Sequence, residues 1–534
     1  MRQLFISIFI GIVSSTNAQI INFPDTVFKR VLVNSSYDLN KDNEIDTIEA
    51  KSIYTLGVTN MNISDLTGIE YFSNLVRILC SSNKIKFIDI SKNFKLRELV
   101  CHINDIDSFK FSNRNDNLKF LSCSSNKLTN IDISQLVNLE ELSIGFNQLT
   151  AIDLSKNPNL KILNCPGNLF DSLSFNNLIN LNRAICYSNK ISKINLNDAV
   201  NLTTLNLDVN KLSTINLFEN INLKELSIVV NTLDSLDISK NKLLESLTCR
   251  DNELVFLKTE GATSLRNLNC SNNNLSKMNL KENPNITDLT CEYNKINELD
   301  FLNNHSLIYV YCNDNNLSEI AINSIPLQIL NCKNNNLSEI NIAHNTNPNT
   351  IDCSNNKLTM IDLEGRSIGY LYCQKNLLNS LNIMNTSLYA LDCSDNKLNS
   401  LNLSTNKLLY SLKLENMPTL ENVCVWELPF TAAISTLSII GSPNINFNKD
   451  CIVNGLDDFI VNSKLVCFPN PTKSIIHIEY SNYSYALLYD MKGKIRKETT
   501  NKEINLNNFE NGNYIISIFD DKDKLIATDK ITKK

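Results

Sequence analysis

The sequence predicts a mainly β protein folded as a right-handed solenoid, and three observations support this fold class. One pattern, L-x-x-L-x-[C/L/I]-x-x-N, recurs along most of the chain at intervals of 20 to 22 residues. Each repeat divides into two similar halves of 10 and 11 residues. Neither half has room for a helix of about ten residues. A fixed period of this length indicates stacked units that share one core rather than several globular domains.

The repeat pattern is first clear at Leu139–Asn147. A strand needs alternating inward residues. Leu142 and Ile144 supply them in the first half, and Ile152 and Leu154 supply them in the second. We therefore predict two parallel sheets, one from each half, with the first-half sheet the more regular and concave one. The last asparagine of each copy should turn inward and bond backbone groups of its own and adjacent coils. These asparagines give about 16 coils, at residues 83, 104, 126, 147, 168, 189, 210, 231, 252, 273, 294, 315, 335, 356, 376 and 396.

These residues resemble the leucine-rich repeat family, and the resemblance covers about two-thirds of the chain, residues 58–420. The usable surface of such a solenoid is its concave sheet. The resemblance therefore implies a scaffold that binds another macromolecule through that face.

The N-terminus predicts export. Met1–Val13 contains one arginine followed by a short apolar run, and small residues precede a cleavage site after Ala18. These features are typical of a secretory signal peptide, residues 1–18. The apolar run is too short to span a bilayer, and no later stretch is apolar enough, so we predict no transmembrane span in the mature chain.

Residues 19–57 form a predicted N-terminal cap. Apolar residues at 27, 28, 31 and 32 have helical spacing, and Asp25 should cap that helix. The next segment resembles the EF-hand calcium loop, with Asn43 in the place of the usual glycine. The resemblance implies a structural Ca²⁺ site, although the loop could also be an acidic turn that binds no metal. Its ligands would be Asp38, Asn40, Asp42, Glu44 through its carbonyl, Asp46 and Glu49.

Thirteen of the sixteen cysteines share one repeat position with isoleucine and leucine, which predicts that they are small buried hydrophobic residues. A redox or metal ladder is the alternative, but no C-x-x-C motif supports it. Residues 421–452 resemble the C-terminal caps of surface leucine-rich repeat proteins. That resemblance implies a disulfide between Cys424 and Cys451, which an oxidising compartment would permit. Cys467 should be buried in the next domain.

The C-terminal segment changes character after a predicted linker at residues 453–463. Residues 464–534 hold short alternating strands, which predict a small antiparallel sandwich. The segment is similar to the C-terminal sorting domain of the type IX secretion system. It has the Pro469–Thr472 opening, a Y-D-x-x-G-K hairpin at Tyr489–Lys494 and the strand that begins at Gly512. The resemblance implies passage through the periplasm and across an outer membrane, to the cell surface or medium.

The composition argues against two classes of function. The net charge is −6, so no basic surface is expected to bind nucleic acid. Only four histidines occur, and no nucleophile motif or phosphate-binding loop accompanies them, so we predict no enzyme.

Tyrosines provide the only candidate binding residues of the repeats. The outward positions of the concave strands are mostly serine, asparagine and aspartate. Exposed aromatic side chains on a rigid sheet are typical of protein interfaces and of sugar-binding surfaces, although tyrosine also suits an exposed strand. The main hypothesis is a protein-binding or adhesion scaffold; the alternatives are a glycan-binding surface module and a structural surface spacer. The candidates are Tyr293, Tyr309, Tyr311, Tyr370, Tyr372 and Tyr389.

Overall fold

A computed structural model describes residues 18–322, 325–340, 342, 348–363, 366–449, 466–479, 484–490, 494–520 and 525–534. The chain divides into two compact units, residues 1–449 and 450–534. The predicted signal peptide, apart from Ala18, and the predicted linker at 453–463 lie outside the described residues. None of the helices in the described ranges is long and apolar enough to cross a membrane.

The first unit begins with two helices, α1 (Thr26–Val33) and α2 (Thr47–Ser52). Asp25 caps α1, as predicted, because its carboxylate accepts the backbone N–H groups of Val27 and Phe28. Phe28 and Ile45 are fully buried against the first coils, so the cap shares the core of the solenoid.

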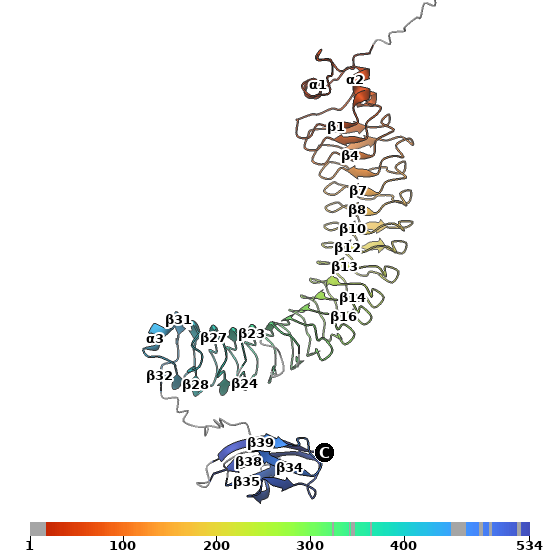
Figure 1. The fold of residues 1–534 in the computed structure, drawn as a ribbon. Coiled ribbons are helices and arrows are strands. Elements are labelled where there is room, and N and C mark those ends of the chain that lie inside the picture. Colours follow the sequence, from red (N-terminus) through yellow and green to blue (C-terminus); the bar gives the residue numbers. More distant parts are fainter. Residues whose placement is uncertain are drawn as a thin grey trace, which may run out of the picture. The chain divides into compact units, whose positions relative to one another are not determined.

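A 19-stranded parallel sheet follows, and its strands pair in chain order. The middle residue of nearly every strand is buried and apolar, so the two flanking residues face outward. Figure 1 shows β23, β27 and β31 on the inner side of the curved solenoid, which confirms the predicted concave sheet. The strands are β1 (Thr55–Gly57), β2 (Arg77–Leu79), β4 (Glu98–Val100), β6 (Phe120–Ser122), β7 (Glu141–Ser143), β8 (Ile162–Asn164), β10 (Arg183–Ile185), β12 (Thr204–Asn206), β13 (Glu225–Ser227), β15 (Ser246–Thr248), β17 (Asn267–Asn269), β18 (Asp288–Thr290), β20 (Tyr309–Tyr311), β22 (Ile329–Asn331), β23 (Thr350–Asp352), β25 (Tyr370–Tyr372), β27 (Ala390–Asp392), β29 (Ser411–Lys413) and β31 (Thr436–Ser438).

The second halves pair less regularly than the first halves, as predicted, and form short separate sheets. Within the described ranges they pair only in twos and in one group of three, on the outer side of the curve (Figure 1). The outer side of a curved stack spreads its coils further apart, and backbone hydrogen bonds weaken steeply with distance. The pairs are β3 (Phe87–Asp89) with β5 (Ser108–Lys110), β9 (Ser172–Ser174) with β11 (Lys193–Asn195), β14 (Ser235–Asp237) with β16 (Phe256–Lys258), β19 (Glu298–Asp300) with β21 (Glu319–Ala321), and β24 (Met360–Asp362) with β26 (Ser380–Asn382); the group is β28 (Ser400–Asn402), β30 (Asn422–Cys424) and β32 (Asn446–Asn448).

The repeated asparagine joins adjacent coils, as predicted. The Asn147 amide nitrogen donates to the carbonyl of Ile144 at 3.0 Å and to that of Cys123, in the preceding coil, at 3.1 Å. Its oxygen accepts the N–H of Leu128 in the preceding coil at 3.0 Å. Buried backbone groups in the turns are satisfied in this way.

The cysteines of the repeat are buried and free, which confirms the sequence prediction. The Sγ atoms of Cys165 and Cys186, in neighbouring coils, lie 3.4 Å apart. Burial raises the pKa of the Cys80 thiol to about 12, so the thiolate does not form near neutral pH.

The C-terminal end of the solenoid, residues 421–449, adds strands to both sides of the stack and the short helix α3 (Phe430–Ala433). Phe430 packs edge-on against Trp426 at 5.1 Å and near Phe447 at 5.0 Å between ring centroids. Cys424 is disulfide-bonded. Cys451 lies outside the described residues, so the Cys424–Cys451 pairing stays a prediction.

The second unit contains two antiparallel sheets around one core, to which Cys467 belongs, as predicted. The described strands are β33 (Val466–Phe468), β34 (Ile475–Glu479) and β37 (Glu503–Asn505) in one sheet, and β35 (Tyr485–Asp490), β36 (Ile495–Thr499), β38 (Gly512–Phe519) and β39 (Leu525–Lys533) in the other.

Candidate binding surfaces

The predicted calcium loop lies between α1 and α2, and backbone hydrogen bonds organise its carboxylates. Asp38 accepts the N–H groups of Lys41 at 2.7 Å and Asn43 at 3.0 Å. Asn43 has a φ of 65°, the left-handed conformation expected where this loop normally has glycine.

The last predicted ligand, Glu49, turns into the same loop. Its carboxylate accepts the N–H of Leu39 at 2.8 Å and, in a capping box, that of Asp46 at 2.9 Å. Asp42 instead pairs with Asn40, and Glu44 with Lys29. Across the described part of the chain, no three His, Cys, Asp or Glu side chains are arranged to hold a metal ion.

On the concave sheet, two columns of residues carry charges in the early coils but not in the late ones. We call them the leading positions: the residue before each strand and the first residue of the strand. Many early coils carry charged pairs there. Lys119 and Lys161 both bond Glu140, at 2.5 and 2.8 Å, and lower the pKa of its carboxyl to about 2.

From β20 to β31 no leading position is charged. Most of these residues carry a hydroxyl, an amide or an aromatic ring. They are Ile308, Tyr309, Gln328, Ile329, Asn349, Thr350, Gly369, Tyr370, Tyr389, Ala390, Tyr410, Ser411, Ser435 and Thr436.

The six predicted tyrosines do not form one patch. Tyr309 and Tyr311 lie together on β20, and Tyr370 and Tyr372 lie on β25. Tyr293 is not on the sheet, because it occupies a turn after β18 with a φ of 53°.

One compact aromatic group does form, and we call Tyr370, Tyr389 and Tyr410 the tyrosine platform. The ring centroids of Tyr370 and Tyr389 lie 6.0 Å apart, and a side-chain hydrogen bond to Tyr410 raises the pKa of Tyr370. Tyr389 is 40% exposed and Tyr410 is 47% exposed. Sequence reasoning missed Tyr410, which immediately precedes β29, although it included Tyr389 in the equivalent place before β27.

A second surface runs along the turns that follow the concave strands. The residue before each repeated asparagine adopts a left-handed conformation, and most coils place Ser, Asn, Asp or Gly there. Those residues tolerate this conformation, whereas a β-branched residue is an outlier. Val209 and Val230 nevertheless occupy it, with φ of 55° and 53°, and are 48% and 44% exposed; Ile103, in an early coil, does so as well, with φ of 57° and 56% exposure.

Apolar residues occupy these turns in five neighbouring coils; Phe146, Val209 and Val230 are exposed and Tyr187 is half-buried, whereas Pro166 and Val229 are buried beneath them. Backbone bonds such as Phe146 N–H to Pro166 O and Val209 N–H to Val229 O, both 2.7 Å, hold the turns side by side. The one charged residue among them, Asp208, accepts hydrogen bonds from Ser227 and from the Val229 N–H. We call this surface the apolar rim: Phe146, Pro166, Tyr187, Val209, Val229 and Val230.

Two glycines allow the apolar rim to lie flat. A Cβ at Gly167 would meet the Phe146 ring at 2.6 Å, and a Cβ at Gly145 would meet the Pro166 ring at 2.8 Å. Any other residue would push these rings away from the surface.

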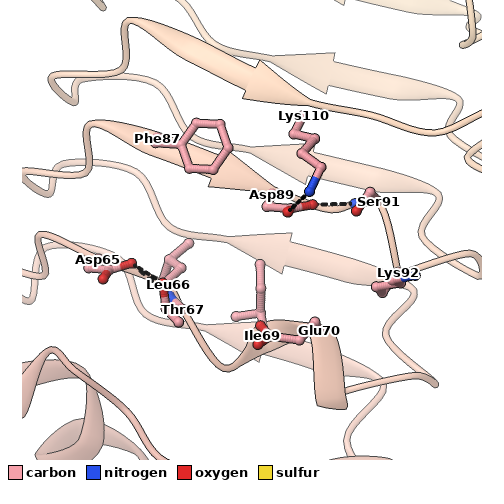
Figure 2. A pocket seen from close by; sticks show the side chains of 10 residues that line it. All are labelled: Asp65, Leu66, Thr67, Ile69, Glu70, Phe87, Asp89, Ser91, Lys92 and Lys110. Atoms are coloured by element: carbon pink, nitrogen blue, oxygen red, sulfur yellow. Dashed lines mark hydrogen bonds and ion pairs between the residues drawn. The ribbon is translucent and has the colours of Figure 1, made fainter.

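A hollow of ≈ 240 Å³ lies on the outer side of the first coils (Figure 2). Figure 2 shows Lys110 reaching across to Asp89, and Lys110 Nζ lies 2.8 Å from Asp89 Oδ2. Asp65 and Glu70, which also line the hollow, accept backbone hydrogen bonds from Thr67 and Gly68. The carboxylates that line the hollow therefore already have hydrogen-bond or ion-pair partners within the protein.

The structure also brings together one serine and one histidine. Ser81 Oγ lies 3.1 Å from His102 Nδ1. Ser81 is only 3% exposed, so its hydroxyl is closed to a substrate.

Comparison with known proteins supports the assignment of both units. The model described as "Leucine Rich repeats (2 copies)" matches residues 116–157, and that described as "Secretion system C-terminal sorting domain" matches residues 466–534. No curated protein matches the chain.

Solved structures are similar in fold. The functional domain of InlJ from Listeria monocytogenes, described as including a cysteine ladder, is 22% identical, with a TM-score of 0.53 over 97% of this chain and 99% of that one. YopM from Yersinia enterocolitica is 19% identical, with a TM-score of 0.52 over 74% of this chain and 92% of that one.

Repeat register, strand topology and the C-terminal match lead to one assignment. The chain combines a leucine-rich repeat solenoid with a type IX secretion C-terminal sorting domain, which directs it to the cell surface or the medium.

Proposed function

We propose that this exported protein is a non-enzymatic scaffold that binds or adheres to another protein through the concave side of its solenoid. The observation that carries the proposal is the apolar rim beside the concave strands. Exposed apolar groups that gather in one place on a soluble surface are typical of interaction sites.

Backbone strain strengthens this argument. A left-handed residue other than glycine costs about 1–2 kcal/mol, and the cost is greatest for branched side chains. Val209 and Val230 are also exposed, so burial does not offset this cost. Strained residues of this kind cluster where they serve binding. Protein interfaces have apolar centres, and the rim supplies one on a rigid support.

The test is a cross-linked pull-down from intact cells with the mature chain and with the double variant Val209→Asn, Val230→Asn. Asparagine tolerates the left-handed conformation, so the variant should be at least as stable as the parent protein while capturing much less partner.

A matched control is Ile179→Asn with Ile221→Asn, which removes two apolar side chains that are 54% and 55% exposed in turns before the strands. This control should retain the partner. Equal capture by the rim variant and the parent protein would refute binding at the rim.

We also propose that the loop of residues 38–49 binds Ca²⁺ and thereby stabilises the N-terminal cap. Asp38 and Glu49 are 6% and 4% exposed and turn into the loop, and Asn43 adopts the required backbone conformation. Ca²⁺ binds six to eight oxygen atoms in flexible geometry, which this donor set can supply once Asn40 and Asp42 release each other.

A further inference from the structure

We infer that the tyrosine platform, together with the Asn349 amide, is a binding site for a neutral carbohydrate chain. This site lies on coils β23 to β29, several coils away from the apolar rim. The inference goes beyond the proposed protein-binding function, and neither depends on the other.

The backbone places Tyr389 and Tyr410 in one column, the residues before β27 and β29, and Tyr370 in the adjacent column as the first residue of β25. Tyr389 N–H donates to Gly369 O at 2.7 Å, and Tyr410 N–H donates to Tyr389 O at 2.9 Å. Adjacent coils lie about 4.8 Å apart, so the two exposed rings are neighbours on a rigid support. Such a row suits a carbohydrate chain, because successive sugar rings can rest on successive aromatic faces.

Small residues make room for the rings. A Cβ at Gly369 would meet Asn349 Oδ1 at 2.6 Å and Tyr389 Cδ2 at 3.2 Å. The strand register places Ala390 beside Tyr370, so no bulky side chain separates Tyr370 from Tyr410. The glycine brings the Asn349 amide and the Tyr389 ring against the same point of the backbone.

The chemistry of the platform matches a sugar. A tyrosine side chain combines an apolar ring with a polar hydroxyl, as a sugar combines apolar C–H faces with hydroxyl groups. The Asn349 amide and the Gln328 amide, which receives the Tyr309 hydroxyl at 3.5 Å, add donors and acceptors in the same columns.

Charge decides between ligand classes. No leading position from β20 to β31 is charged, whereas the early coils carry lysine, arginine and glutamate in the same columns. The nearby outward charges are those of Asp352 and Asp392, one on each side of Tyr372 in the strand register, and of Lys413, which pairs with Asp392 at 3.7 Å and leaves a net negative charge beside the platform. An anionic polysaccharide would find repulsion and no cation in the leading positions, so the complementary ligand is uncharged.

The platform is also too small for a protein interface of its own. Stable protein interfaces bury about 800 Å² on each partner around an apolar centre. The apolar rim supplies an apolar centre of this kind, whereas the tyrosine platform is a short row of hydroxyl-bearing rings.

The test is affinity electrophoresis of the mature full-length protein in native gels that contain mannan, xyloglucan or dextran, with alginate as the anionic comparison. We expect retardation in at least one neutral gel. Tyr389→Ala and Tyr410→Ala should each weaken the interaction at least about tenfold. Tyr389→Phe should keep most of it, because the ring remains.

Tyr293→Ala is the matched control, since Tyr293 is 54% exposed but lies in a turn outside the platform. It should bind like the parent protein. Absence of retardation in every neutral gel, retardation by alginate alone, or unchanged binding by both platform variants would overturn the inference.

The two proposals fail separately. The rim variant Val209→Asn, Val230→Asn should leave the neutral-gel retardation unchanged. If the platform variants instead lost only the cross-linked protein partner, the tyrosines would belong to the protein interface and the carbohydrate site would be refuted.

Discussion

At the scale of the residue, the repeated asparagines hold the solenoid together. Each side chain satisfies backbone groups of its own coil and of the preceding one, as Asn147 does through Nδ2 and Oδ1. Leucine would fill the space but leave these buried polar groups unpaired, which costs about 1–3 kcal/mol for each group.

We therefore expect Asn147→Ala to lower the free energy of unfolding by at least about 2 kcal/mol. The measurement is the urea midpoint followed by far-ultraviolet circular dichroism. Asn159→Ala is the matched control, because Asn159 is exposed and its amide makes long hydrogen bonds to Val137 O at 3.4 Å and to the exposed Asn138 Oδ1 at 3.2 Å. A midpoint for Asn147→Ala equal to that of the control would contradict the proposed role of the ladder.

Asp25 joins the N-terminal cap to the first coil and should make this junction sensitive to acid. Burial raises its pKa, but hydrogen bonds from Phe28 and Ser64 outweigh burial and bring the pKa below its usual value. Because the folded-state pKa is depressed, the stabilisation is present above the unfolded value of about 3.9 and is lost as pH falls through the folded value.

Amide hydrogen exchange of α1 and Ser64, corrected for intrinsic rates, tests this between about pH 5 and pH 2. Protection should decline with acid in the parent protein and should be lower and less dependent on pH in Asp25→Asn. The same decline in both proteins would rule out Asp25 as the source.

At the scale of the element, the loop and α2 form one unit in which Glu49 has two roles. Its carboxylate closes the capping box of α2 and holds the start of the loop. A Ca²⁺ ion bound there would connect both helices of the cap through the same carboxylate.

Chelation should lower the melting temperature of the cap, and Glu49→Gln should abolish that sensitivity because a neutral amide is a poor bidentate ligand. Glu44→Gln is the control, since position 44 would contribute only its backbone carbonyl. Calorimetric titration with Ca²⁺ gives a second measurement. If the melting temperature of the parent protein did not change with chelator, the proposed Ca²⁺ site would be refuted.

At the scale of the whole molecule, the solenoid and the sorting domain have separate cores and separate tasks. No residue is shared between the two buried apolar clusters of the described chain. The solenoid should therefore fold without the C-terminal unit, although export depends on that unit.

Removal of residues 466–534 should leave a folded protein in the periplasm of a host with a type IX system. Cell fractionation locates the protein, and circular dichroism of the purified chain checks its β content. Arrival of the truncated chain at the cell surface would contradict the assigned role of the sorting domain.

Periodicity alone determined which residues are buried. The Asn147 and Cys165 positions were identified as architecture because equivalent residues recur at one interval, and their contacts follow from stacking the coils. The sorting domain was recognisable because its motifs are local. The sequence also indicates that the second-half sheet is the less regular one, but the places where it breaks follow from the curvature of the whole stack, which separates the outer strands.

Only the tertiary structure decided which side chains gather into surfaces. Tyr370 and Tyr410 are 40 positions apart in the sequence, and they meet because Ala390 between them is small and Gly369 leaves space for Tyr389. The apolar rim likewise depends on Gly145 and Gly167 and on a left-handed turn that a pattern of apolar residues does not reveal. A repeat determines which positions are equivalent, but contacts between coils determine what those positions present to a partner.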